Sequence, residues 1–382
     1  MQCVFGKCVY TGSKVVENAY VAWGGGKVVG VGAKPRGEVV GEYDTITPAF
    51  IDAHSHIGMH RAGEPAGEGD VNDSMDSILP LADALDGVMM DDPAFAQCIE
   101  MGVLYSCVVP GSGNLIGGMS AVIRHYAPTS TAALVARAGL KGAMGYNPKT
   151  WGAGQKGTRF STRMGGLAVL RAKLDEVRAK VERRRKARGA KKDEIVLSAA
   201  EHRLADVLAG KLRLRMHAHK SDDVAALLRL VDEFGLKITV EHLGDAFEPE
   251  VFAELARRKI PVIAGPLDAF TSKTEVRHRD WRNLRHMIDA GIRFGIMTDH
   301  PVTVSQNLLV QTRWLLRCGL SRQRAIETIT RVNASILGVD DRLGVLSRGR
   351  WASLTGWTGD PFCLDSYPQA VFAEGGLLYE AD

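Results

Sequence analysis

The chain carries the stretch Thr47-Pro48-Ala49-Phe50-Ile51-Asp52-Ala53-His54-Ser55-His56, an apolar run that ends in two histidines. The apolar part predicts a buried strand, and residues two apart on a strand point to the same side. His54 and His56 can therefore bind one metal ion together, because histidine is a preferred ligand of zinc. The three-residue pattern alone is weak, and a structural role for each histidine is the plain alternative.

Apolar segments of this kind recur through the middle of the chain and alternate with helical patterns. Strands that alternate with helices favour a parallel sheet with right-handed crossover connections. Eight such units predict an α/β fold, a closed (β/α)8 barrel of the TIM type. The strand candidates are residues 46–53, 103–109, 121–125, 140–144, 212–216, 237–240, 261–264 and 293–297.

The two ends of the chain differ from this middle part, because short strands separated by glycine turns dominate both of them. They predict a small β-sandwich domain of residues 1–47 and 343–382, beside a barrel domain of residues 48–342. We expect a helical insertion at about residues 163–211, where apolar residues recur every three or four positions. The basic run at residues 183–188 favours either an anionic partner or, more simply, a solvated helix face.

Further candidate ligands follow later strand candidates. Barrel enzymes place their active sites at the carboxyl ends of the strands, so we expect these side chains to converge. A structural role for any one of them is plausible, but a chance recurrence on several strands is not. These residues are His217, His219, His242 and Asp299.

The order of these residues resembles the amidohydrolase superfamily: His-x-His on the first strand, histidines on the fifth and sixth, and an aspartate on the eighth. The stretches Asn333-Ala334-Ser335-Ile336-Leu337-Gly338 and Gly344-Val345-Leu346 are also similar to that superfamily. Within it, the chain looks most similar to imidazolonepropionase-related amidohydrolases, through residues 110–118 and Thr298-Asp299-His300-Pro301-Val302. Such relatives often have a glutamate where this chain has Tyr146.

The resemblance implies one or two divalent metal ions, with zinc as the expected metal. Lys141 lies on the fourth strand candidate, where many two-metal members carry a carboxylated lysine that bridges the ions. The alternatives for Lys141 are a buried stem with an exposed amine, or a cation that binds substrate. The implied ligands are His54, His56, Lys141, His217, His242 and Asp299.

The resemblance also implies how the reaction is catalysed. Asp299 would accept a proton from the attacking water and pass it to the leaving nitrogen. His242 or His300 would hold the carbonyl oxygen of the substrate. The residues expected to contact substrate are Arg61, Asn114, Tyr146, His219 and His300.

The function that we predict is metal-dependent hydrolysis of an amide C–N bond, in a cyclic amide or a small N-acyl or peptide-like substrate. The same residues also serve a deaminase or an imidazolonepropionase-like ring hydrolase with a single metal ion. A non-catalytic binding protein on the same fold is a third option, and Tyr146 is among the few features that favour it. The metal content of the purified protein separates these options.

The bulk composition narrows the cellular setting. The net charge of +4, from 48 basic and 44 acidic residues in 382, gives no argument for nucleic acid as a partner. Six cysteines without a CxxC pair indicate reduced thiols, and neither a signal peptide nor an 18-residue apolar run is present. We expect a cytoplasmic enzyme with a small-molecule substrate and no membrane contact, and the sequence leaves open whether it forms a homo-oligomer.

Overall fold

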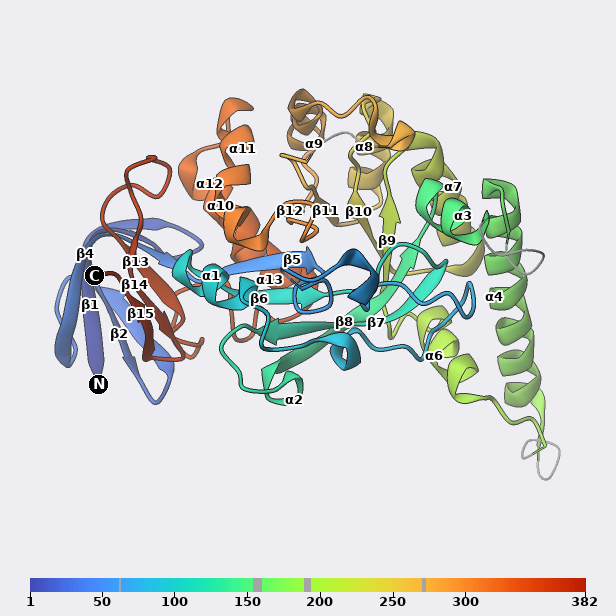
Figure 1. The fold of residues 1–382 in the computed structure, drawn as a ribbon, viewed down its shortest axis with the longest axis horizontal. Helices are drawn as coiled ribbons and strands as arrows, with labels where there is room; N and C mark the ends of the chain where they lie inside the picture. The colour runs from blue at the N-terminus through green and yellow to red at the C-terminus, as the bar shows by residue number, and fades with distance from the viewer. Residues whose placement is uncertain (62, 154–159, 189–193, 270–272) are drawn as a thin grey trace.

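The computed structural model describes residues 1–61, 63–153, 160–188, 194–269 and 273–382 and contains two sheets (Figure 1). An eight-stranded sheet occupies the middle of the molecule, and its strands follow one another in chain order. They are β5 (Phe50–Ser55), β6 (Val103–Val108), β7 (Ile116–Arg124), β8 (Leu134–Ala143), β9 (Leu214–Ala218), β10 (Ile238–His242), β11 (Val262–Ala264) and β12 (Phe294–Ile296).

The two edge strands of this sheet, β5 and β12, meet just beyond their carboxyl ends. The Asp299 backbone N–H donates to His54 O at 3.0 Å, and the His56 N–H donates to His300 O at 3.1 Å. The sheet is therefore nearly closed, as the predicted barrel requires. These two bonds also place the residues after β12 directly against the two histidines of β5.

One part of the barrel prediction is wrong, because β7 runs antiparallel to both of its neighbours, β6 and β8. Only residues 109–115 connect β6 to β7, and no helix of the described chain lies between them. A parallel pairing needs a crossover of about a dozen residues or more, so a connection this short can only return antiparallel. The other strand pairs in this sheet are parallel, as predicted.

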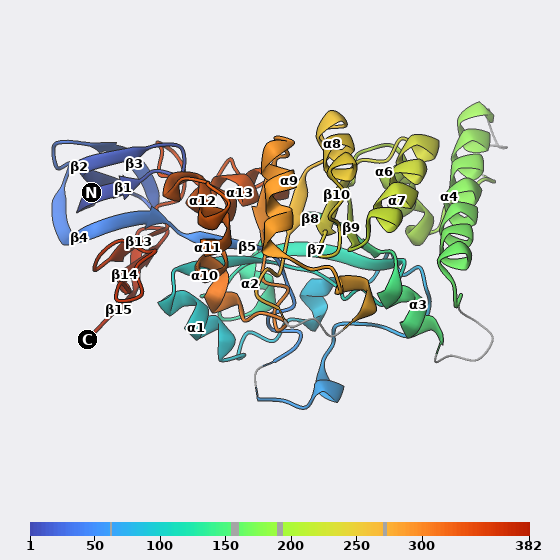
Figure 2. The same cartoon turned by 90° about the horizontal axis from the view of Figure 1, so that it is seen from above.

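Helices pack beside the strands, and Figure 2 shows α7, α8 and α9 next to one another along one side of the sheet. The strongly apolar strands are buried on both faces, as in other sheets covered by helices. The helices are α1 (Ala94–Glu100), α2 (Ser130–Ala133), α3 (Tyr146–Ala153), α4 (Arg163–Lys186), α6 (Ala199–Leu208), α7 (Ser221–Phe234), α8 (Pro249–Arg257), α9 (Leu284–Asp289), α10 (Leu308–Gln311), α11 (Arg313–Arg317), α12 (Arg322–Ile329) and α13 (Arg331–Leu337).

The predicted insertion corresponds to α4 and α6, at the end of the molecule far from both chain termini (Figure 1). The Thr162 side chain caps α4 by accepting the backbone N–H of Gly165, and Leu170, Leu174 and Val177 form its buried stripe. The basic residues at its carboxyl end are half-buried or exposed, and the predicted stop at Gly189 lies outside the described residues.

Both ends of the chain contribute to the second sheet, and both termini lie on it in Figure 1. It has seven strands in the order β15-β14-β13-β4-β1-β2-β3, around a core of its own that includes Trp23, Ile46 and Phe372. The prediction that the two ends fold together is in agreement with this sheet. The strands are β1 (Gln2–Tyr10), β2 (Val15–Gly24), β3 (Lys27–Gly32), β4 (Glu38–Pro48), β13 (Leu354–Trp357), β14 (Pro368–Ala373) and β15 (Gly376–Glu380).

None of the helices that the structure describes is both long enough and apolar enough to span a bilayer.

Candidate metal centre

His54 and His56 stand at the end of β5 with their Nδ1 atoms already engaged. The Nδ1 of His54 pairs with a carboxylate oxygen of Glu241, and the Nδ1 of His56 donates to Val109 O at 2.8 Å. Each Nε2 atom lies 3.3 Å from Oδ1 of Asp299. The two histidines therefore aim the same nitrogen toward the same carboxylate.

Asp299 reaches this position through an unusual backbone conformation, with φ at +52°. A non-glycine residue rarely adopts a positive φ, and such residues gather at functional sites. Burial raises the pKa of Asp299, but the nearby His242, His54 and His56 outweigh it, and the pKa lies well below its usual value. Asp299 is therefore an anion in a buried, histidine-rich setting.

His242, the last residue of β10, is oriented in the same way. Its Nδ1 donates to Gly265 O at 3.1 Å, and its buried Nε2 has no hydrogen-bond partner among the described residues. The buried Nε2 of His54 likewise lacks a hydrogen-bond partner of good geometry in the described part of the chain. A hydrogen bond on one ring nitrogen fixes the tautomer and leaves the other nitrogen free to bind a metal.

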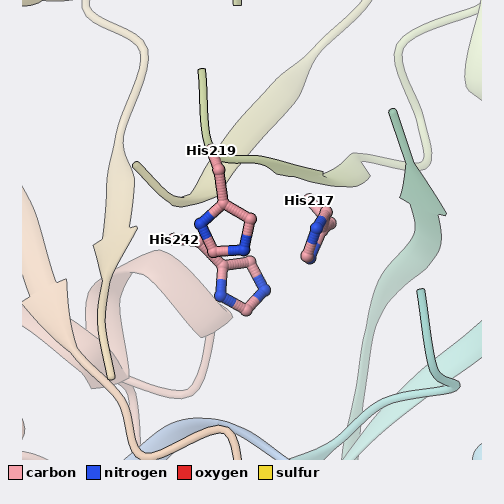
Figure 3. A group of neighbouring side chains, drawn as sticks. All are labelled: His217, His219 and His242. Carbon is pink, nitrogen blue, oxygen red and sulfur yellow. The ribbon is translucent and has the colours of Figure 1, made fainter. Parts of the chain in front are cut away.

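His217 lies on β9 and His219 follows it. Both rings lie next to the ring of His242, with centroids 4.2 and 4.7 Å away (Figure 3). One ligand atom from each of these three histidines lies within 4.8 Å of the others, and so do ligand atoms of His54, His242 and Asp299. Burial lowers the pKa of His217 well below its usual value and that of His219 to about 4. Both rings are therefore neutral at pH 7, which is the form that binds metals.

The donor set fits a divalent metal ion. It combines neutral imidazole nitrogens with carboxylate oxygen, the ligands that zinc and similar metals take in enzymes. Burial lowers the pKa of His54, but Glu241 and Asp299 outweigh it and raise that pKa, so this position attracts positive charge. Unpaired buried polar atoms are costly, and a cation among the free Nε2 atoms would remove that cost.

The His54 ring is held by a buried ion pair that sequence reasoning did not identify. Glu241 receives a hydrogen bond from Arg215 Nε at 2.8 Å, and both side chains are almost completely buried. Arg215 also donates to Ala53 O at 2.6 Å, in the strand that carries His54. The alternation Arg215, His217 along β9 was the available signal, because residues two apart face the same side of a strand.

Lys141 on β8 is fully buried near this group. Its Nζ donates to Pro110 O at 3.1 Å and to Ser112 Oγ at 2.9 Å, and Ser112 Oγ lies 2.9 Å from His217 Nδ1. Burial lowers the pKa of Lys141 to about 8 although Glu241 and Asp299 raise it. A neutral amine is the form that reacts with carbon dioxide, and the lowered pKa gives Lys141 a larger fraction of that form than an exposed lysine has.

Glu275 is a second buried carboxylate that the sequence did not reveal, and it lies in a short 3-10 turn, Thr274–Val276. One oxygen accepts the backbone N–H of Tyr146 at 2.9 Å. The other lies 3.9 Å from the Nε2 atoms of both His217 and His219. Nothing in the local sequence marks this glutamate, because its role depends on contacts with β9 and α3.

The residues predicted to contact substrate divide into two groups. Tyr146, His219 and His300 lie beside the metal-binding candidates. Tyr146 donates its backbone N–H to Glu275, His219 Nε2 lies 3.9 Å from the same carboxylate, and His300 O accepts the backbone N–H of His56. The Asn114 amide instead donates to backbone carbonyls of residues 73 and 76, and Arg61 pairs with Glu64. The structure therefore brings the first group to the centre and shows the second engaged elsewhere.

This nearly closed barrel, with histidines and an aspartate at the carboxyl ends of its strands, is the architecture of metal-dependent hydrolases. Residues 45–376 match the model of the amidohydrolase family, and the chain belongs to that family. Membership confirms the predicted superfamily and places the chain among hydrolases that act on carbon–nitrogen bonds.

Individual relatives agree with this assignment. An amidohydrolase from Thermotoga maritima has 30% sequence identity and a TM-score of 0.93, with all of both chains covered. Amidohydrolase tasK of Hapsidospora irregularis is 25% identical over 88% of this chain, but this chain spans only 36% of its length. A prolidase complexed with N-methylphosphonate-L-proline has 17% identity over the whole of both chains, with a TM-score of 0.63, and shows the fold alone.

Proposed function

We propose that this protein is a zinc-dependent amidohydrolase that cleaves the C–N bond of a cyclic amide or a small N-acyl or peptide-like substrate. The observation that carries the proposal is the position of Asp299, whose Oδ1 lies 3.3 Å from the Nε2 atoms of both His54 and His56. A carboxylate fixed beside metal ligands can both complete the site and move a proton.

The residues that would hold metal are His54, His56, His217, His242 and Asp299, with Lys141 as the candidate bridge. A bound divalent ion lowers the pKa of water toward about 7 and polarises a carbonyl group. The second oxygen of Asp299, Oδ2, lies 4.0 Å from His242 Nδ1 and can accept a proton. It then returns that proton to the leaving nitrogen, as a general base followed by a general acid.

His300 and His242 have different roles in this proposal because they are different tautomers. His300 Nδ1 accepts the backbone N–H of Ser305 at 3.2 Å, and burial lowers the pKa of His300 to about 4. The neutral ring therefore carries its proton on Nε2, where it can donate to the carbonyl oxygen of the substrate. His242 donates its ring proton from Nδ1 to Gly265 O and keeps a lone pair at Nε2, so it serves as a metal ligand.

The domain organisation, the cellular compartment and the partners belong to the same proposal. The sheet from the chain ends, residues 1–47 with 343–382, forms a β-sandwich domain beside the catalytic domain of residues 48–342. The protein is imidazolonepropionase-related and cytoplasmic, and its six cysteines, all free, support a reducing compartment. Its partner is a small molecule, and a homo-oligomer is compatible with the fold.

Elemental analysis of the purified protein tests the metal proposal. We expect zinc to co-purify, and chelator-treated protein to lose both turnover and thermal stability until zinc returns, because binding to the folded state stabilises it. A screen of cyclic amides, N-acyl amino acids and dipeptides should yield C–N hydrolysis. Protein without tightly bound metal, and indifferent to chelator, would instead favour the non-catalytic binding protein.

The number of metal ions tests the role of Lys141. We expect two zinc ions per chain in the wild type and one in Lys141→Met, with turnover of the amide reduced about 100-fold or more. Lys211→Met is the matched control, because Lys211 is largely exposed and its ion pair with Asp206 is long, at 3.6 Å. One ion in both proteins would exclude the bridge and favour the deaminase or ring-hydrolase alternative.

A further inference from the structure

The segment of residues 273–280, after β11, brings two cations to the edge of the metal centre. It also carries Glu275, which lies against His217 and His219. The Nζ of Lys273 donates to the Asn147 side-chain oxygen at 2.9 Å. The Asn147 amide nitrogen in turn lies 3.4 Å from His217 Nε2, so Lys273 is one side chain away from a candidate metal ligand.

Arg279, the second cation, lies over the backbone of Gly244. A methyl group built on Gly244 would lie 3.5 Å from Arg279 Nε and 2.8 Å from His219 Nδ1. One Nη of Arg279 donates to Ala269 O at 3.0 Å, but its buried Nε has no hydrogen-bond partner among the described residues. The buried Nε–H of Arg279 is therefore near His219 and has no acceptor among the described residues.

Neither cation forms an ion pair with a carboxylate in the part of the chain that the structure describes. Burial lowers the pKa of Arg279 and outweighs the effect of the nearby acids Asp299 and Asp245, which raise it. Both acids have other partners: Asp299 faces His54 and His56, and Asp245 pairs with Lys220 at 3.0 Å. A partly buried guanidinium without an ion-pair partner of its own is unfavourable, and an anionic ligand would correct this.

Arg61, by contrast, already has a carboxylate. It pairs with Glu64, so it has less capacity for a substrate anion than Arg279. Beside Arg279 lies a small cavity of about 30 Å³, which Phe252, Leu284 and Met287 line together with His242. The same place therefore offers a free cation and apolar surface next to the metal-binding histidines.

We propose that Arg279, supported by Lys273, binds a carboxylate of the substrate. This inference rests on the proposed function and narrows its substrate class. The substrates would be N-acyl amino acids, or cyclic amides that bear a carboxylate, rather than neutral amides. Arginine suits this role because its planar fork matches a carboxylate with two hydrogen bonds.

The test compares N-acetyl amino acids with their carboxamides, which differ only in the charge of one group. For the zinc-loaded wild type we expect the acids to bind about 10- to 100-fold more tightly than the carboxamides, measured by thermal shift and calorimetry. Arg279→Gln should remove this preference by weakening the acids alone, with zinc content and binding of the carboxamides unchanged. Arg277→Gln, at the exposed neighbouring arginine, should keep it.

Kinetics provide the second readout. In Arg279→Gln the KM for the acids should rise while kcat falls little, because the carboxylate lies away from the bond that breaks. Equal binding of acids and carboxamides by the wild type, no binding of any acid, or an unchanged preference in Arg279→Gln would overturn the inference. Selective binding of the acids without hydrolysis of any compound would instead overturn the proposed function and leave the anion site standing.

Discussion

Replacement of Asp299 by asparagine is expected to lower kcat by about 10²- to 10⁴-fold while zinc content stays close to that of the wild type. The amide keeps an oxygen that can face His54 and His56, where Oδ1 now lies 3.3 Å from both Nε2 atoms. It cannot accept and return a proton at pH 7. The loss should therefore appear in kcat rather than in metal binding.

The backbone around Asp299 makes this a clean comparison. Asp299 has a positive φ, which asparagine tolerates better than most residues, and its N–H is bonded to His54 O. The variant should thus keep the wild-type fold. Asp289→Asn, at an exposed position at the end of α9, controls for the loss of one negative charge.

Two measurements decide the outcome: zinc per chain, and kcat on whichever amide the screen identifies. Near-normal kcat with a full complement of zinc would refute the proton-transfer role of Asp299. Loss of zinc together with activity would show that the carboxylate acts mainly as a ligand.

The sequence predicted most strands of the central sheet well, because each contains a largely apolar, buried run. It failed at β7, where the connection from β6 turned out to be too short for a crossover. The prediction placed that strand at residues 121–125, whereas β7 begins at Ile116. An apolar run locates a strand but does not give its direction. Because the predicted strand began at residue 121 and not at Ile116, the connection from β6 looked longer than it is.

The histidines and Asp299 were predictable for a different reason. Side chains at the carboxyl ends of barrel strands converge whatever the details of the helices. Their recurrence after several strand candidates, together with the resemblance to the amidohydrolase superfamily, therefore identified them. Glu241, Arg215 and Glu275 were missed because their roles arise between strands and loops that are distant in sequence. The different roles of His242 and His300 also needed the structure, because each depends on which ring nitrogen meets a backbone group.

The second large effect is expected from Arg215→Met. This change leaves the buried Glu241 carboxylate without its arginine, although His54 still contacts it. Breaking a buried ion pair by removing one partner typically costs about 3–5 kcal/mol, because the other charge remains buried. For a chain of this length that corresponds to a fall in Tm of roughly 4–6 °C. Since Glu241 orients the His54 ring, zinc affinity should also fall, by about 10- to 100-fold.

The pH dependence of this defect follows from Glu241. Burial raises the pKa of Glu241, but Arg215 and His54 outweigh it and hold the pKa at about 2. In the wild type, the stability that ionised Glu241 contributes is present at neutral pH and is lost as pH falls from about 4.5 through 2. Without Arg215, burial favours the protonated acid, so the variant loses stability as pH rises. The difference in Tm between the two proteins should therefore be larger at pH 7 than at pH 4.

Thermal unfolding across this pH range, with zinc removed from both proteins, is the measurement. Arg171→Met is the matched control, since it removes an arginine from a partly exposed ion pair with Glu233 and should cost less than about 1 kcal/mol at any pH. If Arg215→Met were as stable as this control, the buried pair would contribute nothing to the fold. If its deficit did not shrink toward pH 4, Glu241 would not be the charge that Arg215 neutralises, and the support of His54 would have to come from the bond between Arg215 and Ala53 O alone.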